Sequence, residues 1–309
     1  MREVGAVNMN YKKIIANRKT REKILRCLSF IPDRQMITLQ YRIKTGRKLN
    51  LKTPCRYTEK LQWCKLYYRD PKMIQCVDKY DVRDYIEKAG FGEILNECYG
   101  VYDYVDDIDF NKLPNEFVIK DTLGGGGNRV IICTDKAKVD WNETKERLRE
   151  WVEEPLVKFG GREWPYYSGK KHRILIEKYL PGGENGLVDY KFMCFDGKVE
   201  ICFILTDRNL GVSVKEAICD RNLSLLPYSE IGYKIPNNIQ KPDNYDKMLE
   251  VAEKISKEFP HVRVDLYNIN GRIIFGEMTF FDSSGYGLFS PDEFDFVLGK
   301  YFHLPKTSK

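Results

Sequence analysis

The sequence has little of what builds zinc or redox sites. It holds three histidines, and its nine cysteines include no CxxC pair. Zinc sites draw on closely spaced cysteine and histidine ligands, so neither structural zinc nor a redox dithiol is expected. The sequence also lacks an apolar run near the roughly eighteen residues that cross a bilayer. Its start lacks the apolar core of a secretory signal peptide. We therefore expect a cytoplasmic protein with reduced thiols.

Charge is distributed unevenly along the chain. Of its 309 residues, 42% are hydrophobic and 13% aromatic, the composition of a globular protein large enough for two or three lobes. The formal charge is +6, but residues 1–60 hold 16 basic and 4 acidic side chains, so that this part carries +12 and the rest carries −6. A basic segment is attracted to anionic lipid, acidic polymer or nucleic acid, and composition alone does not choose among them.

The apolar pattern predicts helices in the first third of the chain and again between later strands. Helices are expected at 10–28, from Thr58 as N-cap, at 71–90, at 143–158 and at 244–258. Pro32 is expected to end the first of them. That basic, amphipathic helix either lies on an anionic membrane surface or packs on the body of the protein by one apolar stripe, and the sequence leaves both readings open.

Strands are expected from about residue 117 onward. Two short ones, 117–121 and 129–133, flank a glycine run, and a third covers 172–180. Two hairpins follow, turning at Asp196-Gly197 and near Asn270-Gly271. Helices first, then antiparallel hairpins with inserted helices, predict an α+β fold.

Four consecutive glycines suggest an anion-binding loop. Gly124, Gly125, Gly126 and Gly127 lie between two expected strands, where a backbone without side chains can approach a ligand and point N–H groups at anionic oxygens. There is no helix after them and no P-loop or dinucleotide motif. With Lys120 on the preceding strand, the run is typical of a flap over a polyphosphate, although an exposed strand lysine beside a flexible hairpin tip would look the same.

Two carboxylates on the last hairpin form a candidate metal site. If its turn has three residues with a bulge at Gly271, Asp265 and Glu277 become diagonal neighbours on one face, whereas a two-residue turn would put them on opposite faces. Paired carboxylates repel one another unless a cation joins them, and magnesium prefers such oxygen ligands together with phosphates. Two surface acids, or a salt bridge from Arg263 to Glu277, are the alternatives.

In combination, these motifs resemble the ATP-grasp superfamily, and more closely its TupA-like, teichuronopeptide-biosynthesis type. The strings that carry the resemblance include TPCRYTEKLQWCKLYYRDP, DFNKLPNEFVIKDTLGGGGN, DYKFMCFDGK and FPHVRVDLYNINGRIIFGEMTF. The resemblance runs from about residue 35 to 305 and implies a three-lobed α+β fold in which ATP is held between two α+β domains. Its parts would be an N-terminal lobe (35–116), a lid with the glycine flap (117–178) and a C-terminal subdomain with the magnesium hairpin (179–309), preceded by the basic helical arm (1–34) that the charge pattern predicts.

The resemblance also implies roles for individual residues. Lys120 and the glycine flap would contact the phosphates of ATP, with Lys79 and Arg83 flanking the nucleotide from the first lobe. The hinge would consist of Glu177, Lys178, Tyr179 and Leu180, with the backbone of Lys178 and Leu180 contacting adenine and Glu184 reaching the ribose. Lys191 and Arg263 would approach the γ-phosphate or the acceptor. Asp265 and Glu277 would hold Mg²⁺, with Thr279 where many relatives have a metal-binding asparagine, which makes a second metal ion doubtful.

The activity implied by the resemblance is ATP-dependent joining of a carboxylate to an amine through an acylphosphate. The partners implied are a sugar acid and an amino acid or other amine of a surface polysaccharide, met at the inner face of the membrane through residues 1–60. Nucleic acid is not expected, because the basic charge precedes an acidic body. A kinase acting on a sugar or polyol would use the same ATP residues. A glycosyltransferase using the Asp107-Ile108-Asp109 string and a non-catalytic binding protein are further alternatives.

Overall fold

The computed structural model describes residues 17–125, 127, 129–156, 160–183, 186–209, 213–239 and 241–306. Its helices are α2 (Arg18–Cys27), α3 (Asp33–Thr45), α4 (Tyr57–Tyr67), α5 (Pro71–Cys76), α6 (Val82–Lys88), α7 (Trp141–Glu153), α8 (Tyr245–Ser256) and α9 (Phe294–Tyr301). Its strands are β1 (Cys98–Tyr102), β2 (Phe117–Asp121), β3 (Val130–Cys133), β4 (Ile174–Lys178), β5 (Asp189–Phe195), β6 (Lys198–Asn209), β7 (Ser213–Asp220), β8 (Ser229–Glu230), β9 (His261–Ile269), β10 (Arg272–Thr279) and β11 (Phe289–Ser290). Helices and antiparallel sheets are thus combined, which confirms the α+β class.

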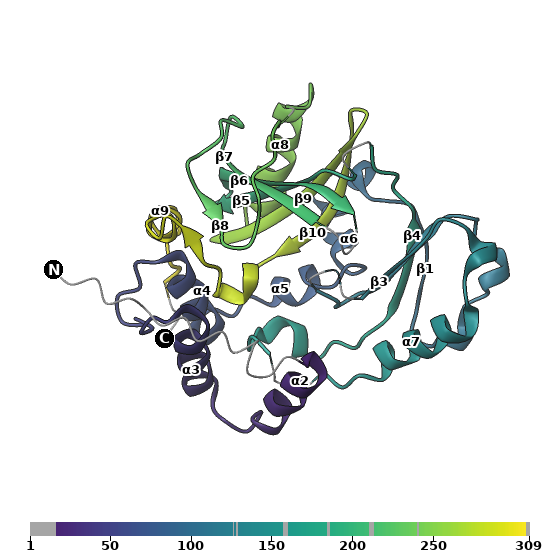
Figure 1. Cartoon of the computed structure of the whole chain (residues 1–309), viewed down its shortest axis with the longest axis horizontal. Coiled ribbons are helices and arrows are strands. Elements are labelled where there is room, and N and C mark those ends of the chain that lie inside the picture. The colour runs from purple at the N-terminus through teal and green to yellow at the C-terminus, as the bar shows by residue number, and fades with distance from the viewer. Residues whose placement is uncertain are drawn as a thin grey trace.

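The smaller main sheet has the order β1-β4-β2-β3, and all its pairings are antiparallel. Its apolar face packs with α7 through a separate core that includes Phe117, Ile176, Leu148 and Trp151. Figure 1 shows this sheet and α7 beside the rest of the molecule. A core of its own makes this lid a distinct unit of packing.

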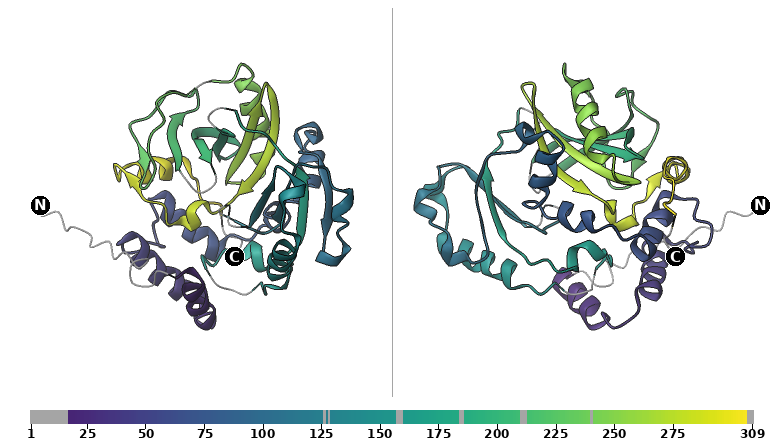
Figure 2. Two further views of the ribbon diagram at one scale, coloured as in Figure 1. Left: turned by 45° about the vertical axis from the view of Figure 1, so that its right-hand side comes forward. Right: turned by 180° about the vertical axis from the view of Figure 1, so that it is seen from behind.

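The larger sheet has the order β10-β9-β5-β6-β7, in which β6 pairs with β5 on one side and with β7 on the other. Helix α8 covers one face, where the Cys194 thiol contacts the Ala252 carbonyl and the side chains are apolar. Figure 2 shows the sheet from two further directions. Because side chains alternate along a strand, the opposite face receives Asp189 and Lys191 of β5 together with Arg263 and Asp265 of β9. The hairpins expected around Asp196-Gly197 and Asn270-Gly271 are both confirmed.

The N-terminal helices differ from the sequence prediction in two places. Thr58 is not the N-cap of α4, which begins at Tyr57; its backbone N–H and hydroxyl instead donate to the buried Asp295 of α9, at 3.0 and 2.8 Å. The helix expected over 71–90 is divided into α5 and α6. Asp78, between them, accepts hydrogen bonds from the N–H groups of Tyr80 (2.9 Å) and Asp81 (3.0 Å), which closes a turn and interrupts the helix.

The basic arm packs on the body where the structure describes it. Pro32 does not simply end the first helix: α2 stops at Cys27, and Pro32 precedes α3, a helix that the sequence pattern did not predict. The buried Arg162 donates to the carbonyls of Leu28 and Ile31, at 2.9 and 3.0 Å. Arg26 also pairs with Glu154. The interpretation that the helix packs on the body of the protein is therefore confirmed for α2. Residues 10–16 of the expected helix lie outside the described residues.

All nine cysteines lie in described segments and carry free thiols. Within the same segments, no helix combines the length and the apolar character that a membrane crossing requires.

Candidate functional site

Lys79 lies between the lid and the larger sheet. It belongs to the turn that Asp78 closes, and its backbone N–H donates to the Thr122 carbonyl at 2.9 Å, at the end of β2. Its ammonium contacts the Gly124 carbonyl and lies 3.7 Å from Glu277 Oε2 on β10. One side chain of the N-terminal lobe thus contacts both the base of the glycine flap and the candidate metal hairpin.

Lys120 and Glu177 form an ion pair on the lid sheet. Antiparallel pairing of β2 with β4 puts Val118 opposite Glu177, and Lys120 is its diagonal neighbour on the same face. Lys120 Nζ lies 2.6 Å from Glu177 Oε2, and Arg83 Nη1 lies 3.4 Å from the other carboxylate oxygen. Desolvation acts to lower the pKa of Lys120, but Glu177 outweighs it and raises that pKa. Lys120 therefore stays cationic at neutral pH and can face an anion.

The glycine flap begins where the backbone has no room for a side chain. A Cβ on Gly124 would lie 2.8 Å from Arg129 Cβ and 3.2 Å from Asp121 Cβ, whereas one on Gly125 would meet nothing within 4 Å. Gly127 has φ +71°, a conformation that favours glycine. Gly126 lies outside the described residues. The packed base and open tip fit a loop whose backbone can approach a ligand.

The expected hinge ends β4. Lys178 lies opposite Phe117 in the sheet, its N–H donates to the Glu97 carbonyl, and its own carbonyl accepts from Asn96 Nδ2, both at 2.9 Å. The Lys178 carbonyl keeps a second lone pair, but its N–H is engaged within the protein. Tyr179 and Leu180 follow the strand. Glu184, expected at the ribose, lies outside the described residues.

Asp265 and Glu277 face each other directly, by a route that the sequence did not predict. The turn has two residues, Asn270 and Gly271, both with positive φ, so the three-residue turn was wrong. A bulge at Gly276 then shifts the register and restores the pair on one face. A Cβ at Gly276 would lie 3.0 Å from the Asp265 carbonyl, which explains glycine there.

Arg263 connects the acidic groups of this face. Its guanidinium donates to Asp265 at 2.7 and 2.8 Å, to Glu277 at 3.1 Å and to the Thr279 hydroxyl at 3.1 Å, and it also contacts Asp282. Burial acts to lower its pKa, but Asp265 and Asp282 raise it well above the usual value. The salt bridge from Arg263 to Glu277, which the sequence left as an alternative, is therefore present as part of a larger network.

Lys191 lies on the adjacent strand, directly opposite Asp265. It pairs with Asp265 and, at 2.8 Å, with Asp189 Oδ2. Burial and the charge of Arg263 act to lower its pKa, but Asp189 and Asp265 outweigh them, so its pKa is raised and it is an ammonium at neutral pH. Asp189 was not predicted as a site residue, although its place two residues before Lys191 on a strand already puts both on one face.

The donor set on this face fits a magnesium ion completed by ligands from outside the protein. Asp265 and Glu277 supply hard oxygens beside the Thr279 hydroxyl, whose Oγ1 lies 3.3 Å from Glu277 Oε1. Glu277 keeps 36% of its side chain exposed, whereas Asp265 keeps 2%. No cluster of three or more acidic, histidine or cysteine side chains suited to a metal occurs among the described residues. These residues suit an ion that shares its coordination with phosphate.

The Asp107-Ile108-Asp109 string lies elsewhere, in the connection between β1 and β2. Asp107 and Asp109 are exposed and Ile108 is buried. The Asp109 carboxylate accepts from the Asn111 N–H at 3.1 Å and pairs with Lys112 at 3.3 Å. This arrangement caps a short 3₁₀ turn (Phe110–Lys112) and is an ordinary surface structure.

Comparisons with known proteins relate the chain to one family. The family model described as TupA-like ATPgrasp matches residues 59–303. Among solved structures, the D-alanine–D-alanine ligase from Bacillus anthracis is similar at 19% identity and TM-score 0.42, over 67% of this chain and 57% of that one. The D-alanine–D-alanine ligase from Helicobacter pylori is similar at 13% identity and TM-score 0.41, over 75% of this chain and 60% of that one. N5-carboxyaminoimidazole synthetase from Staphylococcus aureus, complexed with ADP, is similar at 15% identity and TM-score 0.38, over 75% of this chain and 52% of that one.

These alignments span less than two thirds of each solved chain. A comparison with curated proteins gave no match.

Proposed function

The chain belongs to the TupA-like ATP-grasp family, and from that membership we propose that it is an ATP- and Mg²⁺-dependent ligase that joins a carboxylate to an amine. One observation carries the proposal. Lys191, Arg263, Asp265 and Glu277 come from three adjacent strands and converge on one sheet face, and Lys79 links that face to the glycine flap. Phosphoryl transfer requires such a set of positioned cations and oxygen ligands, with little further chemistry from the protein.

The lid and first lobe are proposed to hold ATP. Lys120 and Lys79 supply ammonium groups at the base of the flap, which neutralise phosphate charge, and the flap covers the phosphates with backbone N–H groups. The Leu180 backbone N–H and the second lone pair of the Lys178 carbonyl are proposed to contact adenine. Both cations have carboxylate neighbours, Glu177 and Glu277, so binding of phosphate exchanges one anion for another.

Asp265, Glu277 and Thr279 are proposed to hold Mg²⁺. When bound, the ion would withdraw charge from the phosphate oxygens. Arg263 has two functions in this arrangement. It keeps the nearly buried Asp265 ionised by donating to both carboxylate oxygens, and its guanidinium can neutralise the phosphoryl group in transfer.

The proposed reaction has two steps. A substrate carboxylate attacks the γ-phosphorus, the bond to ADP breaks, and an acylphosphate forms while Lys191 and Arg263 stabilise the equatorial oxygens. A neutral amine then attacks the acyl carbon, phosphate leaves, and the amine gives up a proton to form the amide. Closure of the flap excludes water, which would otherwise hydrolyse the acylphosphate.

We further propose that a sugar acid and an amino acid or other amine of a surface polysaccharide are the substrates. This part rests on the resemblance to teichuronopeptide-biosynthesis proteins and on no residue of the site.

The test combines ATP binding with product analysis. Lys120→Ala and Glu277→Ala should each weaken ATP binding in the presence of Mg²⁺ at least tenfold by calorimetry. Lys112→Ala is the matched control, because its side chain is 85% exposed in the connection between β1 and β2. Full-length protein is then incubated with ATP, uronic acids and amines. Phosphate release that needs both carboxylate and amine supports a ligase; a stable phosphorylated sugar identifies a kinase, and absence of ATP binding refutes the proposal.

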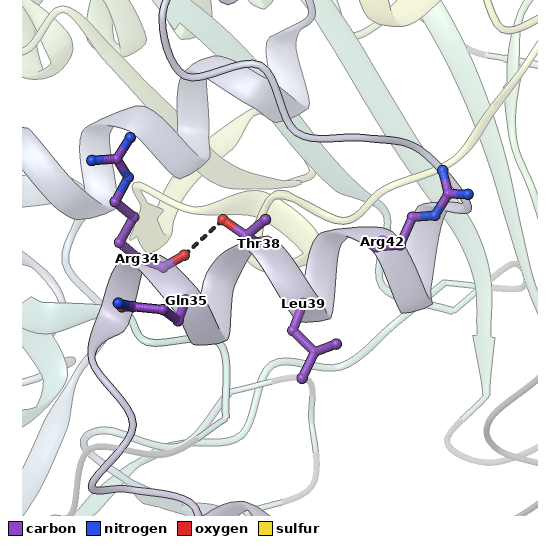
Figure 3. A pocket seen from close by; sticks show the side chains of 5 residues that line it. All are labelled: Arg34, Gln35, Thr38, Leu39 and Arg42. Atoms are coloured by element: carbon purple, nitrogen blue, oxygen red, sulfur yellow. Dashed lines mark hydrogen bonds between the residues drawn. The ribbon is translucent and has the colours of Figure 1, made fainter.

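We also propose that Phe30 and the exposed side of α3, within the basic segment 1–60, dock on an anionic surface. A pocket of about 630 Å³ is lined by Arg34, Gln35, Thr38, Leu39 and Arg42, and Figure 3 shows these side chains following one another along α3. Leu39 is 50% exposed, and Phe30 before it is 79% exposed. Arginines beside exposed apolar side chains favour anionic lipid. Phe30→Ala and Arg34→Glu should reduce salt-sensitive sedimentation with phosphatidylglycerol vesicles; equal sedimentation of variants and native protein contradicts the proposal.

A further inference from the structure

A second group of carboxylates lies on the reactive face of the larger sheet, beyond the residues assigned to ATP and Mg²⁺. Glu216 of β7 is opposite Leu205 of β6, which in turn is opposite Asp189 of β5. Cross-strand partners share a face, so Glu216 projects from the same face as Asp189 and Lys191. Glu216 is 5% exposed, and its Oε1 atom has no hydrogen-bond partner among the described residues.

Glu230 and Asp282 approach Glu216 from other elements. The Glu230 backbone N–H hydrogen-bonds the Glu216 carboxylate, and the Glu230 side chain accepts from the Ser283 hydroxyl at 3.1 Å. Burial and the negative charge of Glu230 raise the pKa of Glu216 to about 8, and burial and Asp282 raise the pKa of Glu230 to about 7. Glu216 and Glu230 therefore lie close together, with too little positive charge nearby to keep both carboxyl groups ionised.

The nearby cations are already engaged. Lys191 is close enough to lower the pKa of Glu216, but it pairs with Asp189 and Asp265. Arg263 pairs with Asp282, Asp265 and Glu277. A buried carboxylate oxygen without a partner destabilises the fold, and a hydrogen-bonded cation from outside would relieve that cost. A purely structural role does not account for Glu216, because glutamine would fill the same volume without charge.

We propose that Glu216 and Glu230 bind the ammonium group of the acceptor amine, hold it beside the phosphoryl-transfer site, and accept one of its protons before the neutral amine attacks the acyl carbon. This inference rests on the proposed function, because it assigns the amine-binding part of the same site. Asp282 joins the two regions: it contacts Arg263 on one side and acts electrostatically on Glu230 on the other. Asp282 therefore connects an amine held at this pair with the network that faces the transferred phosphoryl group.

The pair suits an ammonium better than a metal ion. An ammonium carries one charge and three N–H donors, which match carboxylate oxygens on two sides and the Ser283 hydroxyl. A bound ammonium would favour ionisation of Glu216 and Glu230, and the ionised pair would then repel a carboxylate next to the amino group. The site therefore favours an amine without an adjacent carboxylate.

The test measures binding of small amines by calorimetry to the full-length protein, with and without Mg²⁺ and a non-hydrolysable ATP analogue. The probes are glycine methyl ester and ethanolamine, with glycine as the matched probe that carries a carboxylate. Native protein should bind the first two at least tenfold more tightly than glycine. Glu216→Gln should reduce their affinity at least tenfold while its Tm stays equal or rises. Glu250→Gln, on the exposed face of α8, should change neither quantity.

Several results would overturn the inference. They are equal binding of the ester by native protein and the Glu216→Gln variant, no binding of either amine by native protein, and displacement of the amines by Mg²⁺ alone. If Glu216→Gln unfolds, Glu230→Gln provides the same comparison from the other carboxylate. The ATP analogue is titrated separately, so loss of nucleotide binding refutes the proposed function, whereas normal nucleotide binding without amine binding refutes only this inference.

Discussion

Lys65 makes the stability of this protein depend on pH in a predictable way. This lysine of α4 is 1% exposed, and its ammonium donates to the carbonyls of Gly161 and Ser284, both at 2.7 Å. Burial lowers its pKa from 10.5 to about 7. The unfolded chain therefore binds a proton more tightly than the folded protein, and stability rises with pH between these two values. Below about pH 7 the penalty is constant, at about 5 kcal/mol from 1.36 kcal/mol per pKa unit.

Lys65→Met isolates this effect. The variant removes the Lys65 hydrogen bonds to the Gly161 and Ser284 carbonyls, of which Ser284 keeps the one from Gln62 Nε2 at 3.0 Å, and this loss adds an offset that does not depend on pH. Buried thiols, whose pKa values are raised, titrate alike in both proteins and cancel in the difference. From pH 7.0 to 8.5 the native protein should gain roughly 1.5 kcal/mol relative to the variant, from the same linkage relation.

Urea unfolding of both proteins at several pH values measures this gain. Parallel pH profiles would refute the reasoning, since they would mean that Lys65 has the same proton affinity in the folded and unfolded states.

Three further substitutions test other parts of the structure. Arg162→Ala removes the buried hydrogen bonds to the Leu28 and Ile31 carbonyls after α2, so limited proteolysis should cut near residues 28–31 faster than in native protein. An unchanged cleavage rate would show that Arg162 does not hold this segment. Gly124→Ala should cost about 1–3 kcal/mol by urea unfolding because its Cβ has no room, whereas Gly125→Ala should cost little; equal costs would contradict the packing difference. Arg263→Met should destabilise by about 3–5 kcal/mol because it leaves Asp265 underpaired; a loss below about 1 kcal/mol would show that the network contributes little.

The features that the sequence predicts well are those decided by neighbouring residues. Asp196-Gly197 and Asn270-Gly271 fix hairpin turns through local backbone preference, and alternating apolar residues fix the strands on either side. Lys120 could be found from its place on a strongly β-forming run before the glycines, and Glu177 from the family resemblance, as part of the expected hinge. Their contact could not, since it depends on which strands pair.

The features that the sequence misses depend on distant contacts. Asp78 interrupts an expected helix by accepting from the N–H groups of Tyr80 and Asp81, and Arg173, from the segment before β4, also binds its carboxylate at 2.8 Å. Thr58 has the chemistry of a helix cap but instead bonds Asp295, near the end of the chain. Glu216 carries no local signal of any kind. Its significance comes from burial, from its place across two strands from Asp189, and from the approach of Glu230.

Because of the bulge at Gly276, the number of residues in the hairpin turn does not by itself decide whether the two candidate metal ligands lie on the same face of the sheet. With a two-residue turn and no bulge, deletion of this one residue would keep every ligand in the sequence and yet move Glu277 and Thr279 to the helix-covered side of the sheet. A relative with one more residue in the turn and none in the bulge would reach the same arrangement. The interval between Asp265 and Glu277 is the same in both arrangements, so this interval identifies equivalent sites without showing whether the extra residue lies in the turn or in the bulge.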